Sequence, residues 1–388
     1  MNEWKKVRFL DVVHLNPRIS LEKGVEYPFV EMSNVVPCAR KPEKDVFKKY
    51  LGEGTKFEQG DTIVARIEPC LQNGKGFQCS YKQGFGSTEF LVFRPVNIND
   101  LDCDFLYYYM GQQSIREAMA KTMVGASGRQ RVNNKVFNDL QINLPPLSTQ
   151  HRIASILSRY DSLIENYQKQ IKLLEEAAQR LFKEWFVDLR FPGHENTNII
   201  DGVPEGWEKK KLHEIAEVVM GSSPKSEFYN NDKQGLPFHQ GVGSYGTRFV
   251  DDNVYSTSIT RLAGPNSILF SVRAPVGRLN ITKNKIIIGR GLAAMNHKDG
   301  FQSFLFYMLK ERFFMDNIIG NGSIFASISK VELLDQEFIV PPMKTIKAFE
   351  SLASKLDKKI QGVDTQLHLL TEARDRLLPK LMSGEITI

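Results

Sequence analysis

The chain has 388 residues, 41% of them hydrophobic, and its 51 Lys and Arg against 45 Asp and Glu give a net charge of +6. This length is too great for one ordinary hydrophobic core and suits two domains of roughly 150 residues with connecting elements. No stretch approaches the ~18 uninterrupted apolar residues of a membrane span, and the N-terminus lacks a signal-peptide core, so a cytoplasmic globular protein is expected. The positive charge favours an anionic partner but does not prove one.

Residues 1–144 consist mostly of short β-like runs separated by Gly, Pro and Asn, which predicts a β-rich domain. All four cysteines lie in this segment, at Cys38, Cys70, Cys79 and Cys103. They lack the paired short spacing of a zinc site, so free, buried thiols are expected.

Residues 145–192 begin with two prolines and then place apolar residues alternately four and three positions apart. This heptad seam predicts a long helix, whose first turn tolerates the prolines because its amides have no intrahelical partner, while Ser148 or Thr149 caps them. The predicted seam residues are Ile153, Leu157, Tyr160, Ile164, Ile171, Leu174 and Leu181.

A linker over residues 193–204 leads to a second β-rich domain, 205–340, and a second long helix, 341–388. The second seam has one lapse, at Arg374, and Pro379 and Gly384 are expected to weaken the end of the helix. The predicted seam residues here are Phe349, Leu356, Ile360, Val363, Leu367, Leu370 and Leu377.

The two halves are an internal repeat. An offset of 196 residues aligns Pro145-Pro146 with Pro341-Pro342 and Asp161 with Asp357, without a gap. Two helices with one apolar seam each bury it most simply against each other. The sequence therefore predicts an α+β protein in which two domains with β-rich cores are separated by two antiparallel helices that form a coiled coil, with a pseudo-two-fold axis. Such helices would act as a ruler along a long regular ligand, and DNA is one.

Basic residues gather in windows that lack acidic residues. Residues 253–298 contain no Asp or Glu, and weaker windows occur at 121–135 and 72–82. Lys and Arg contact DNA phosphates, and Arg also binds guanine bidentately. The alternative for any single residue is a solvated loop charge. The DNA-binding candidates are Arg66, Lys75, Lys82, Arg129, Arg131, Lys135, Arg261, Arg273, Arg278, Lys283, Lys285 and Arg290.

Motifs that carry chemistry are absent from the sequence. Residues 241–246 spell the glycine pattern of a dinucleotide loop, but no helix-period segment follows, so a plain turn is expected. No Gly-Lys-Ser/Thr phosphate-binding loop occurs, and the seven histidines have no metal-ligand spacing. We therefore expect a recognition component that is not an enzyme and binds neither metal nor cofactor.

Four segments resemble a known family. They are 144–147 with Gln150, 181–186 (Leu-Phe-Lys-Glu-Trp-Phe), 202–207 (Gly-Val-Pro-Glu-Gly-Trp) and 376–386. On these motifs the chain resembles, over essentially its whole length, the specificity (S) subunits of type I restriction-modification systems, the HsdS family. It departs from the family pattern at Thr149, where Glu is frequent, and in the second helix start, which lacks the Gln.

The resemblance implies two target recognition domains that each read one half of an asymmetric bipartite site in double-stranded DNA. It implies helices that fix the gap and dock two methyltransferase (M) subunits, which bind S-adenosylmethionine and methylate adenine N6. It also implies optional restriction (R) subunits, which use ATP and Mg²⁺ for cleavage.

Two alternatives belong to other classes: a coiled-coil assembly or adaptor protein whose β-rich domains bind a ligand other than DNA, and a self-contained enzyme with an unfamiliar site. Salt-dependent affinity for duplex DNA, and methylation by the isolated chain, would discriminate them. Apolar residues on the outer helix faces are partner-docking residues or a second row of core: Ile156, Leu163, Phe182, Phe186, Leu352, Leu378 and Met382.

Overall fold

The computed structural model describes residues 4–126, 128–313 and 327–388. Its contacts divide the chain into two compact units: unit 1 is Met1–Gln168 with Thr365–Ile388, and unit 2 is Lys169–Asp364. This division splits each long helix between the units, whereas the sequence assigned each helix to a spacer of its own. The boundaries given above stay a prediction.

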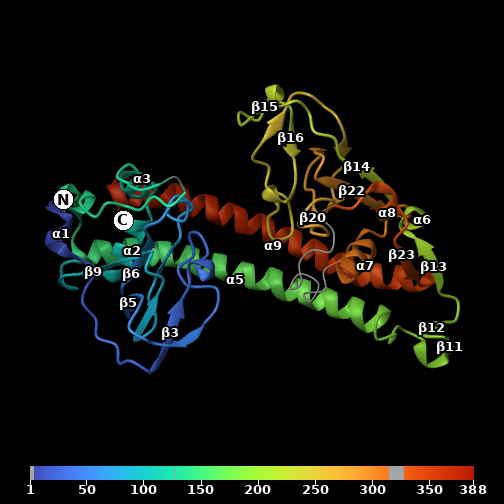
Figure 1. Cartoon of the computed structure of the whole chain (residues 1–388), viewed down its shortest axis with the longest axis horizontal. Helices are drawn as coiled ribbons and strands as arrows, with labels where there is room; N and C mark the ends of the chain where they lie inside the picture. Colours follow the sequence, from blue (N-terminus) through green and yellow to red (C-terminus); the bar gives the residue numbers. More distant parts are fainter. Residues whose placement is uncertain (1–3, 127, 314–326) are drawn as a thin grey trace. The chain divides into compact units, whose positions relative to one another are not determined.

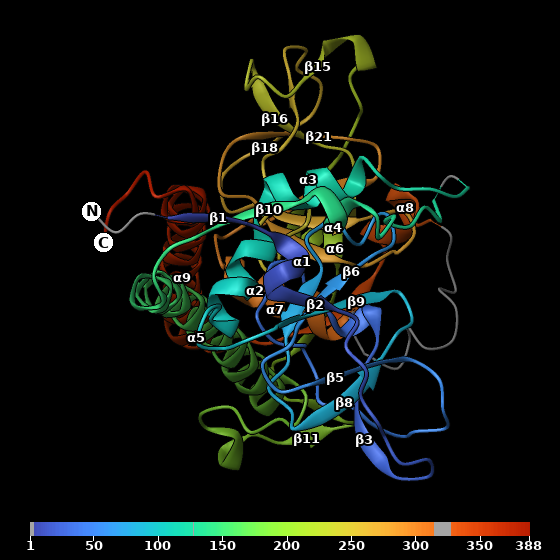
Figure 2. The ribbon, with the colours of Figure 1, turned by 90° about the vertical axis from the view of Figure 1, so that its left-hand side faces the viewer.

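Unit 1 holds two four-stranded sheets and a separate strand pair (Figures 1 and 2). The first sheet, which is antiparallel, has the order β2 (Val13–Leu15), β9 (Phe90–Pro95), β6 (Thr62–Ala65) and β7 (Gly76–Gln78). The second has the order β4 (Phe47–Lys49), β3 (Glu26–Val30), β8 (Gln83–Gly86) and β5 (Thr55–Glu58), and its β3 and β8 are parallel. β1 (Lys5–Arg8) pairs with β10 (Gln141–Leu144).

Short helices pack against the first sheet of unit 1. They are α1 (Phe9–Val12), α2 (Cys103–Gly111), α3 (Gln113–Ala120) and α4 (Val136–Asp139), and a 3-10 turn, η1 (Met32–Asn34), follows β3. Phe9, Phe93 and Phe137 are fully buried and meet with ring centroids 5.2–6.0 Å apart. This aromatic contact joins α1, β9 and α4 into one core.

Unit 2 repeats this arrangement nearly strand for strand. β13 (Glu208–Lys211) pairs with β23 (Glu337–Val340), and an antiparallel sheet follows with the order β14 (Ala216–Met220), β22 (Leu292–His297), β19 (Ile268–Ser271) and β20 (Leu279–Ile281). A further sheet has the order β15 (Tyr229–Asn230), β17 (Tyr255–Ser256), β16 (Leu236–His239), β21 (Ile286–Ile288) and β18 (Leu262–Ala263), with β16 and β21 parallel.

The remaining elements of unit 2 are short, apart from α7 (Gln302–Phe313), and are named here with their bounds: α6 (Leu212–Ile215), α8 (Lys330–Leu334), η2 (His194–Asn196), β11 (Ile199–Ile200), β12 (Val203–Pro204), η3 (Ser226–Phe228) and η4 (Val242–Ser244). Each unit therefore contains one parallel strand pair and one antiparallel four-stranded sheet in the same order. The mixed α+β fold and the internal repeat are confirmed.

The two long helices are α5 (Leu147–Phe186) and α9 (Met343–Ser383). α9 continues through Pro379 and ends before Gly384, whose φ of 77° only glycine adopts without cost. In unit 1 the start of α5 shares a core with the end of α9, through Leu157 and Leu381. In unit 2 Phe182 near the end of α5 meets Phe349 near the start of α9, at 5.7 Å between ring centroids. The pairing in each unit is antiparallel, as predicted.

The fourteen predicted seam residues are all buried or half-buried, and Leu157, Phe349 and Ile360 are fully buried. Their individual contacts across the seam stay a prediction. Of the residues on the outer faces, Phe182 and Met382 are core, and Ile156, Phe186 and Leu378 are half-buried. Leu163 and Leu352 are exposed to 45% and 43%. The cysteines are free, but burial was predicted wrongly for most of them, since Cys79 is buried, Cys38 is exposed and the other two are intermediate.

A buried cluster of charged and hydroxyl groups, the Asp161 cluster, attaches the β-rich part of unit 1 to its helices. Asp161 of α5 receives a hydrogen bond from the Tyr108 hydroxyl of α2 at 2.6 Å, and its other oxygen pairs with Arg374 of α9 at 2.9 Å. Asp161 and Arg374 are exposed to only 6% and 8%. Arg374, the lapse in the predicted seam, is therefore a buried ion-pair partner.

An equivalent group, the Asp357 cluster, lies in unit 2. Asp357 occupies the position of Asp161 in the repeat, and the Tyr307 hydroxyl of α7 donates to it at 2.8 Å. The cation comes from a different place: Arg248, in the loop after η4, lies 2.7 Å from Asp357 and 3.5 Å from Glu175. Its guanidinium carbon also stands 3.6 Å from the centre of the Phe306 ring. Tyrosine and aspartate are thus repeated, whereas the arginine is supplied by unrelated segments.

The first helix turns are also anchored differently in the two units. Buried Gln150 of α5 accepts from the Asp102 amide and donates to the Asp100 carbonyl, both at 2.9 Å, at the start of α2. The second helix lacks this glutamine, and Glu350, one turn further along α9, instead accepts from the amides of Ser303 and Phe304 at the start of α7. Burial raises the pKa of Glu350 despite these hydrogen bonds.

Candidate nucleic-acid interface

Four of the candidate basic residues of unit 1 gather where β6 ends and β7 begins, beside the end of β8. The amide of Ala65 donates to the Lys75 carbonyl at 3.0 Å. Because Arg66 directly follows Ala65, this hydrogen bond places Lys75 beside Arg66. The segment 129–131 joins them, because the Val132 amide bonds the Arg66 carbonyl at 2.9 Å and Ile67 bridges to Arg131. We call Arg66, Lys75, Glu89, Arg129 and Arg131 the first loop edge.

Glu89 organises the cations of the first loop edge. Arg131 donates to both of its carboxylate oxygens, at 2.9 Å from Nε and 2.6 Å from Nη2. The hydrogen bonds from Arg131 hold the pKa of Glu89 below its ordinary value, and the charges of Arg131 and Arg66 add to this effect. Lys75 donates to the Met32 carbonyl at 2.8 Å. The side chains are thus oriented, while Arg129 and Arg131 remain exposed.

The second loop edge lies at the equivalent end of β19 in unit 2. The amide of Ser271 bonds the Arg278 carbonyl at 2.9 Å, and Arg273 follows two residues after this strand. The Val272 amide bonds the Gly291 carbonyl at 2.9 Å, which places Arg290 alongside, and the Ile288 amide bonds the Arg261 carbonyl at 2.9 Å. We define the second loop edge by its four basic residues, Arg261, Arg273, Arg278 and Arg290.

The other candidates lie elsewhere in their units. Lys82 is at the opposite end of β6, where its carbonyl accepts from the Gln59 amide. Lys283 and Lys285 precede β21 at the opposite end of β19, and Lys283 forms an ion pair of 2.6 Å with Asp364 of α9. Lys135 directly precedes α4. The structure therefore brings four candidates together within unit 1 (Arg66, Lys75, Arg129 and Arg131) and, separately, the four arginines within unit 2. The other four candidates, Lys82, Lys135, Lys283 and Lys285, lie outside these two groups. DNA contact by any of them stays a prediction.

Polar residues that the sequence patterns did not single out complete the second loop edge. The Ser223 hydroxyl donates to the Gln240 side-chain oxygen at 2.7 Å and accepts from the Arg290 amide at 3.1 Å. Because Ser223 and Arg290 are 67 residues apart, no local spacing could have found this contact. Residues 241–246 contain the 3-10 turn η4, in agreement with the plain turn expected there.

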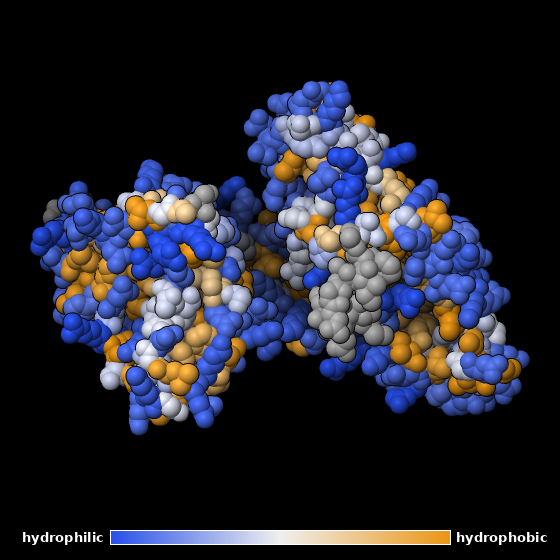
Figure 3. Space-filling view, viewed as in Figure 1, coloured by the Kyte–Doolittle hydropathy of each residue, from blue (hydrophilic) through white to orange (hydrophobic). Residues whose placement is uncertain are grey.

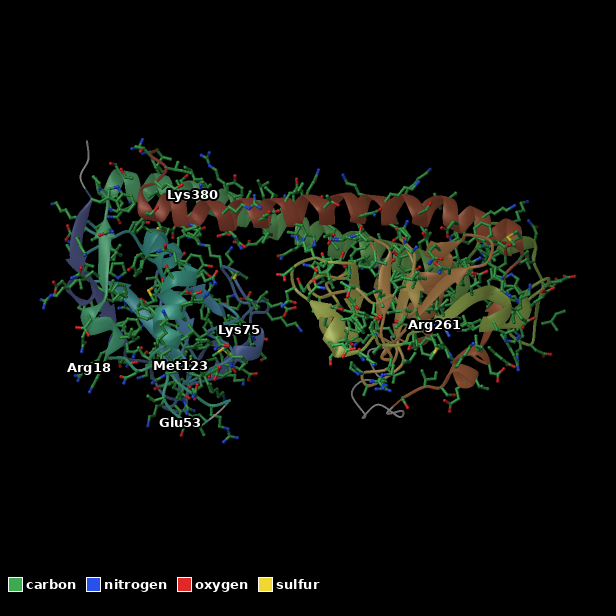
Figure 4. All side chains as sticks on the ribbon, turned by 90° about the horizontal axis from the view of Figure 1, so that it is seen from above. Arg18, Glu53, Lys75, Met123, Arg261 and Lys380 are labelled. Atoms are coloured by element: carbon green, nitrogen blue, oxygen red, sulfur yellow. The ribbon has the colours of Figure 1, made fainter. Side chains whose placement is uncertain are left out.

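The visible surface of each unit is mostly hydrophilic. Figure 3 shows hydrophilic residues over most of the visible face of each unit, with smaller apolar patches, and Figure 4 marks Lys75 and Arg261 on the β-rich parts rather than on the helices. No helix of the described ranges combines the length and hydrophobicity that a membrane crossing needs. Within residues 4–126, 128–313 and 327–388, no group of three His, Cys, Asp or Glu residues is arranged to hold a metal ion.

The comparisons with known proteins agree with one another. The type I restriction modification DNA specificity domain matches residues 1–176 and 204–367. A putative type I restriction enzyme MjaX specificity subunit from Methanocaldococcus jannaschii is 32% identical over 307 residues, which are 77% of this chain and 71% of that protein. The HindI specificity subunit from Haemophilus influenzae is 22% identical over the whole of both chains. The type I S subunit of M. genitalium has a similar fold, with a TM-score of 0.54, 18% identity and coverage of 97% and 96%.

Both halves of the duplicated α+β scaffold match a DNA specificity domain, which identifies the chain as a DNA-recognition protein. This match favours DNA recognition over the alternative of a coiled-coil adaptor protein. The chain belongs to the family of type I restriction-modification specificity subunits, whose role is DNA sequence specificity.

The loop edges predict a charge effect that depends on position. Replacing Arg273 and Arg290 together by Gln should weaken binding of the purified chain to duplex DNA and lower the slope of log affinity against log salt by about 1–2, since each phosphate contact contributes ~0.9. The matched control, Lys285→Gln with Lys298→Gln, removes the same charge at the opposite end of the sheet and should leave the slope unchanged. Fluorescence anisotropy across a salt series measures both. Equal slopes for the two variants would contradict an interface at the loop edge.

Proposed function

We propose that each β-rich part of this chain reads one half of an asymmetric bipartite target in double-stranded DNA. The observation that carries the proposal is the pair of loop edges, which occupy equivalent places in the repeat but carry different side chains. Arg66, Lys75 and Arg131 stand in unit 1, while Arg261, Arg273 and Arg290 stand in unit 2. Phosphates attract both sets alike, whereas different side chains at equivalent places favour different bases.

In this proposal the helices fix the gap between the half-sites and dock two methyltransferase subunits. Four exposed leucines on α5 and α9 are the candidates for docking, since an apolar patch on a helix surface favours a protein partner. Leu163, Leu173, Leu352 and Leu369 are exposed to 45%, 53%, 43% and 61%. Leu173 and Leu369 are equivalent in the repeat, as two identical partners require.

The chemistry is proposed to reside on those partners. S-adenosylmethionine would bind the methyltransferase subunits, which would flip the target adenine out of the duplex and methylate N6. ATP and Mg²⁺ would serve the restriction subunits where these are present. The chain itself would be a non-catalytic, cytoplasmic recognition subunit without a cofactor.

Co-expression with the methyltransferase subunit tests this proposal. Mapping N6-methyladenine in the host DNA should show methylation at one bipartite motif only when the chain is present. Exchange of residues 1–144 for those of another specificity subunit should alter one half of the motif and leave the other half and its methylation intact. Methylation that is indifferent to the chain, or an exchange that alters both halves, would refute the proposal.

A further inference from the structure

Glu31 and Gln240 occupy the same backbone position in the two units. Each residue directly follows the first strand of the parallel pair, β3 in unit 1 and β16 in unit 2. The carbonyl of the preceding residue accepts the same hydrogen bond in both, from Ser87 to Val30 at 3.1 Å and from Gly289 to His239 at 2.8 Å. A glutamate and a glutamine of nearly identical shape therefore stand at one repeated place.

Both residues adjoin the basic loop edges. Lys75 donates to the carbonyl of Met32, the neighbour of Glu31, at 2.8 Å. The carbonyl of Gln240 accepts from the Gly291 amide at 3.1 Å, and Gly291 in turn accepts from Val272, the neighbour of Arg273. Both side chains are exposed. Cations that hold phosphates would thus bring base edges within reach of these two side chains.

The side chain of Gln240 is held in a fixed orientation. The Ser223 hydroxyl donates to its Oε1 at 2.7 Å. The side chain also lies across Gly289, where an added Cβ would stand 2.8 Å from Oε1, so this close approach requires a glycine. An amide that is oriented before binding loses less side-chain freedom when it forms two hydrogen bonds with a base.

The side chain of Glu31 is oriented by its own partners. Lys48 of β4 lies 2.6 Å from Oε1, and the Ser33 hydroxyl donates to Oε2 at 3.4 Å. The hydrogen bond from Lys48 lowers the pKa of Glu31, which keeps the carboxylate ionised at neutral pH. A carboxylate accepts hydrogen bonds and donates none, whereas the amide of Gln240 does both.

We propose that Glu31 and Gln240 are base-reading residues, one for each half-site: Gln240 contacts an adenine through N6 and N7, and Glu31 accepts from the N4 amino group of a cytosine. These are the pairings that the donor and acceptor pattern of the major groove gives to a side-chain amide and a carboxylate. The inference rests on the function proposed above and adds to it the residue and the base at one position of each half. Exchanging the two residue types should exchange the preference.

The experiment uses Glu31→Gln and Gln240→Glu in the full chain, co-expressed with the methyltransferase subunit. The controls lie at the opposite ends of the two strands: Glu26→Gln changes the exposed first residue of β3, and Gln234→Glu changes an exposed residue two positions before β16. Glu31→Gln should shift one position of one half-site from cytosine to adenine by tenfold or more, and Gln240→Glu should shift one position of the other half from adenine to cytosine. The controls should leave the methylated motif unchanged.

A motif that stays unchanged in both variants while methylation persists would overturn the inference and leave the proposed function standing. If methylation is lost, the purified complex is used to select duplexes from a pool with randomised half-sites, and the base preference at each position is read from the selected duplexes. Circular dichroism shows whether the variant is folded. A selected base change at one position supports the inference. Uniformly weaker binding to all sequences, or unchanged selection, overturns it. Failure of the proposed function would appear separately, as methylation by the system without the wild-type chain.

Discussion

Replacing Arg248 by methionine is expected to lower the free energy of unfolding of unit 2 by about 3–5 kcal/mol, the cost of leaving buried charges without a partner. Arg248 is exposed to only 2%, and its removal leaves the carboxylates of Asp357 and Glu175 without this ion-pair partner. Burial raises the pKa of the Tyr307 hydroxyl in the same cluster, so this group stays neutral and remains a hydrogen-bond donor to Asp357 without supplying a positive charge. Methionine retains the volume that packs on Phe306 but supplies no charge.

Urea unfolding followed by tryptophan fluorescence measures this effect, because Trp185 and Trp207 both belong to unit 2 and Trp4 alone belongs to unit 1. Arg261→Met is the matched control, since Arg261 is exposed and its replacement should change stability by about 0.5 kcal/mol or less. Adding Asp357→Asn to Arg248→Met should recover part of the loss, which a double-mutant cycle quantifies. A loss no greater than that of the control would show that the Asp357 cluster does not stabilise unit 2.

Arg374→Leu is the second change with a large expected effect, and here sequence pattern and structure predict opposite signs. The heptad pattern alone favours leucine, because the substitution places an apolar residue at the one seam position that lacks it. The structure predicts a loss of about 3–5 kcal/mol, because Asp161 would remain buried with Tyr108 as its polar partner. Burial by itself lowers the pKa of Arg374, but its bond to Asp161 and the charges of Asp161 and Asp375 outweigh this and raise it.

Replacing the whole Asp161 cluster separates lost charge pairing from lost packing. A triple variant, Arg374→Leu with Asp161→Leu and Tyr108→Phe, removes the charged and hydroxyl groups of the cluster together. It should be close to the wild type or more stable, as is found when buried ion pairs are exchanged for apolar residues. Hydrogen exchange of peptides from α2 and the start of α5 reports on unit 1 specifically. Stabilisation by the single Arg374→Leu change would contradict the role given to this ion pair.

The Asp161 and Asp357 clusters also indicate how the repeat has diverged. The tyrosine and the aspartate stand on helices in both units, and both survive at equivalent places. The arginine comes from α9 in unit 1 and from a loop of the β-rich part in unit 2. Any basic side chain that reaches the buried carboxylate satisfies its charge, so the segment that supplies the cation is free to change while the acceptor is not.

The sequence by itself determined the repeat, the two long helices with their antiparallel pairing, and the β-rich part that precedes each helix, because helical periodicity and strand runs depend on neighbours in the chain. Only the tertiary structure decided which charges meet. Asp161 and Arg374 are 213 residues apart, and Arg131 reaches Glu89 across 42. The same long-range packing placed Lys82 at the opposite end of β6 from Lys75, its partner in one acid-free window. It also placed Lys283 and Lys285 at the opposite end of β19 from the arginines of their window. Composition shows that cations are plentiful, but strand pairing decides which end of a sheet carries them.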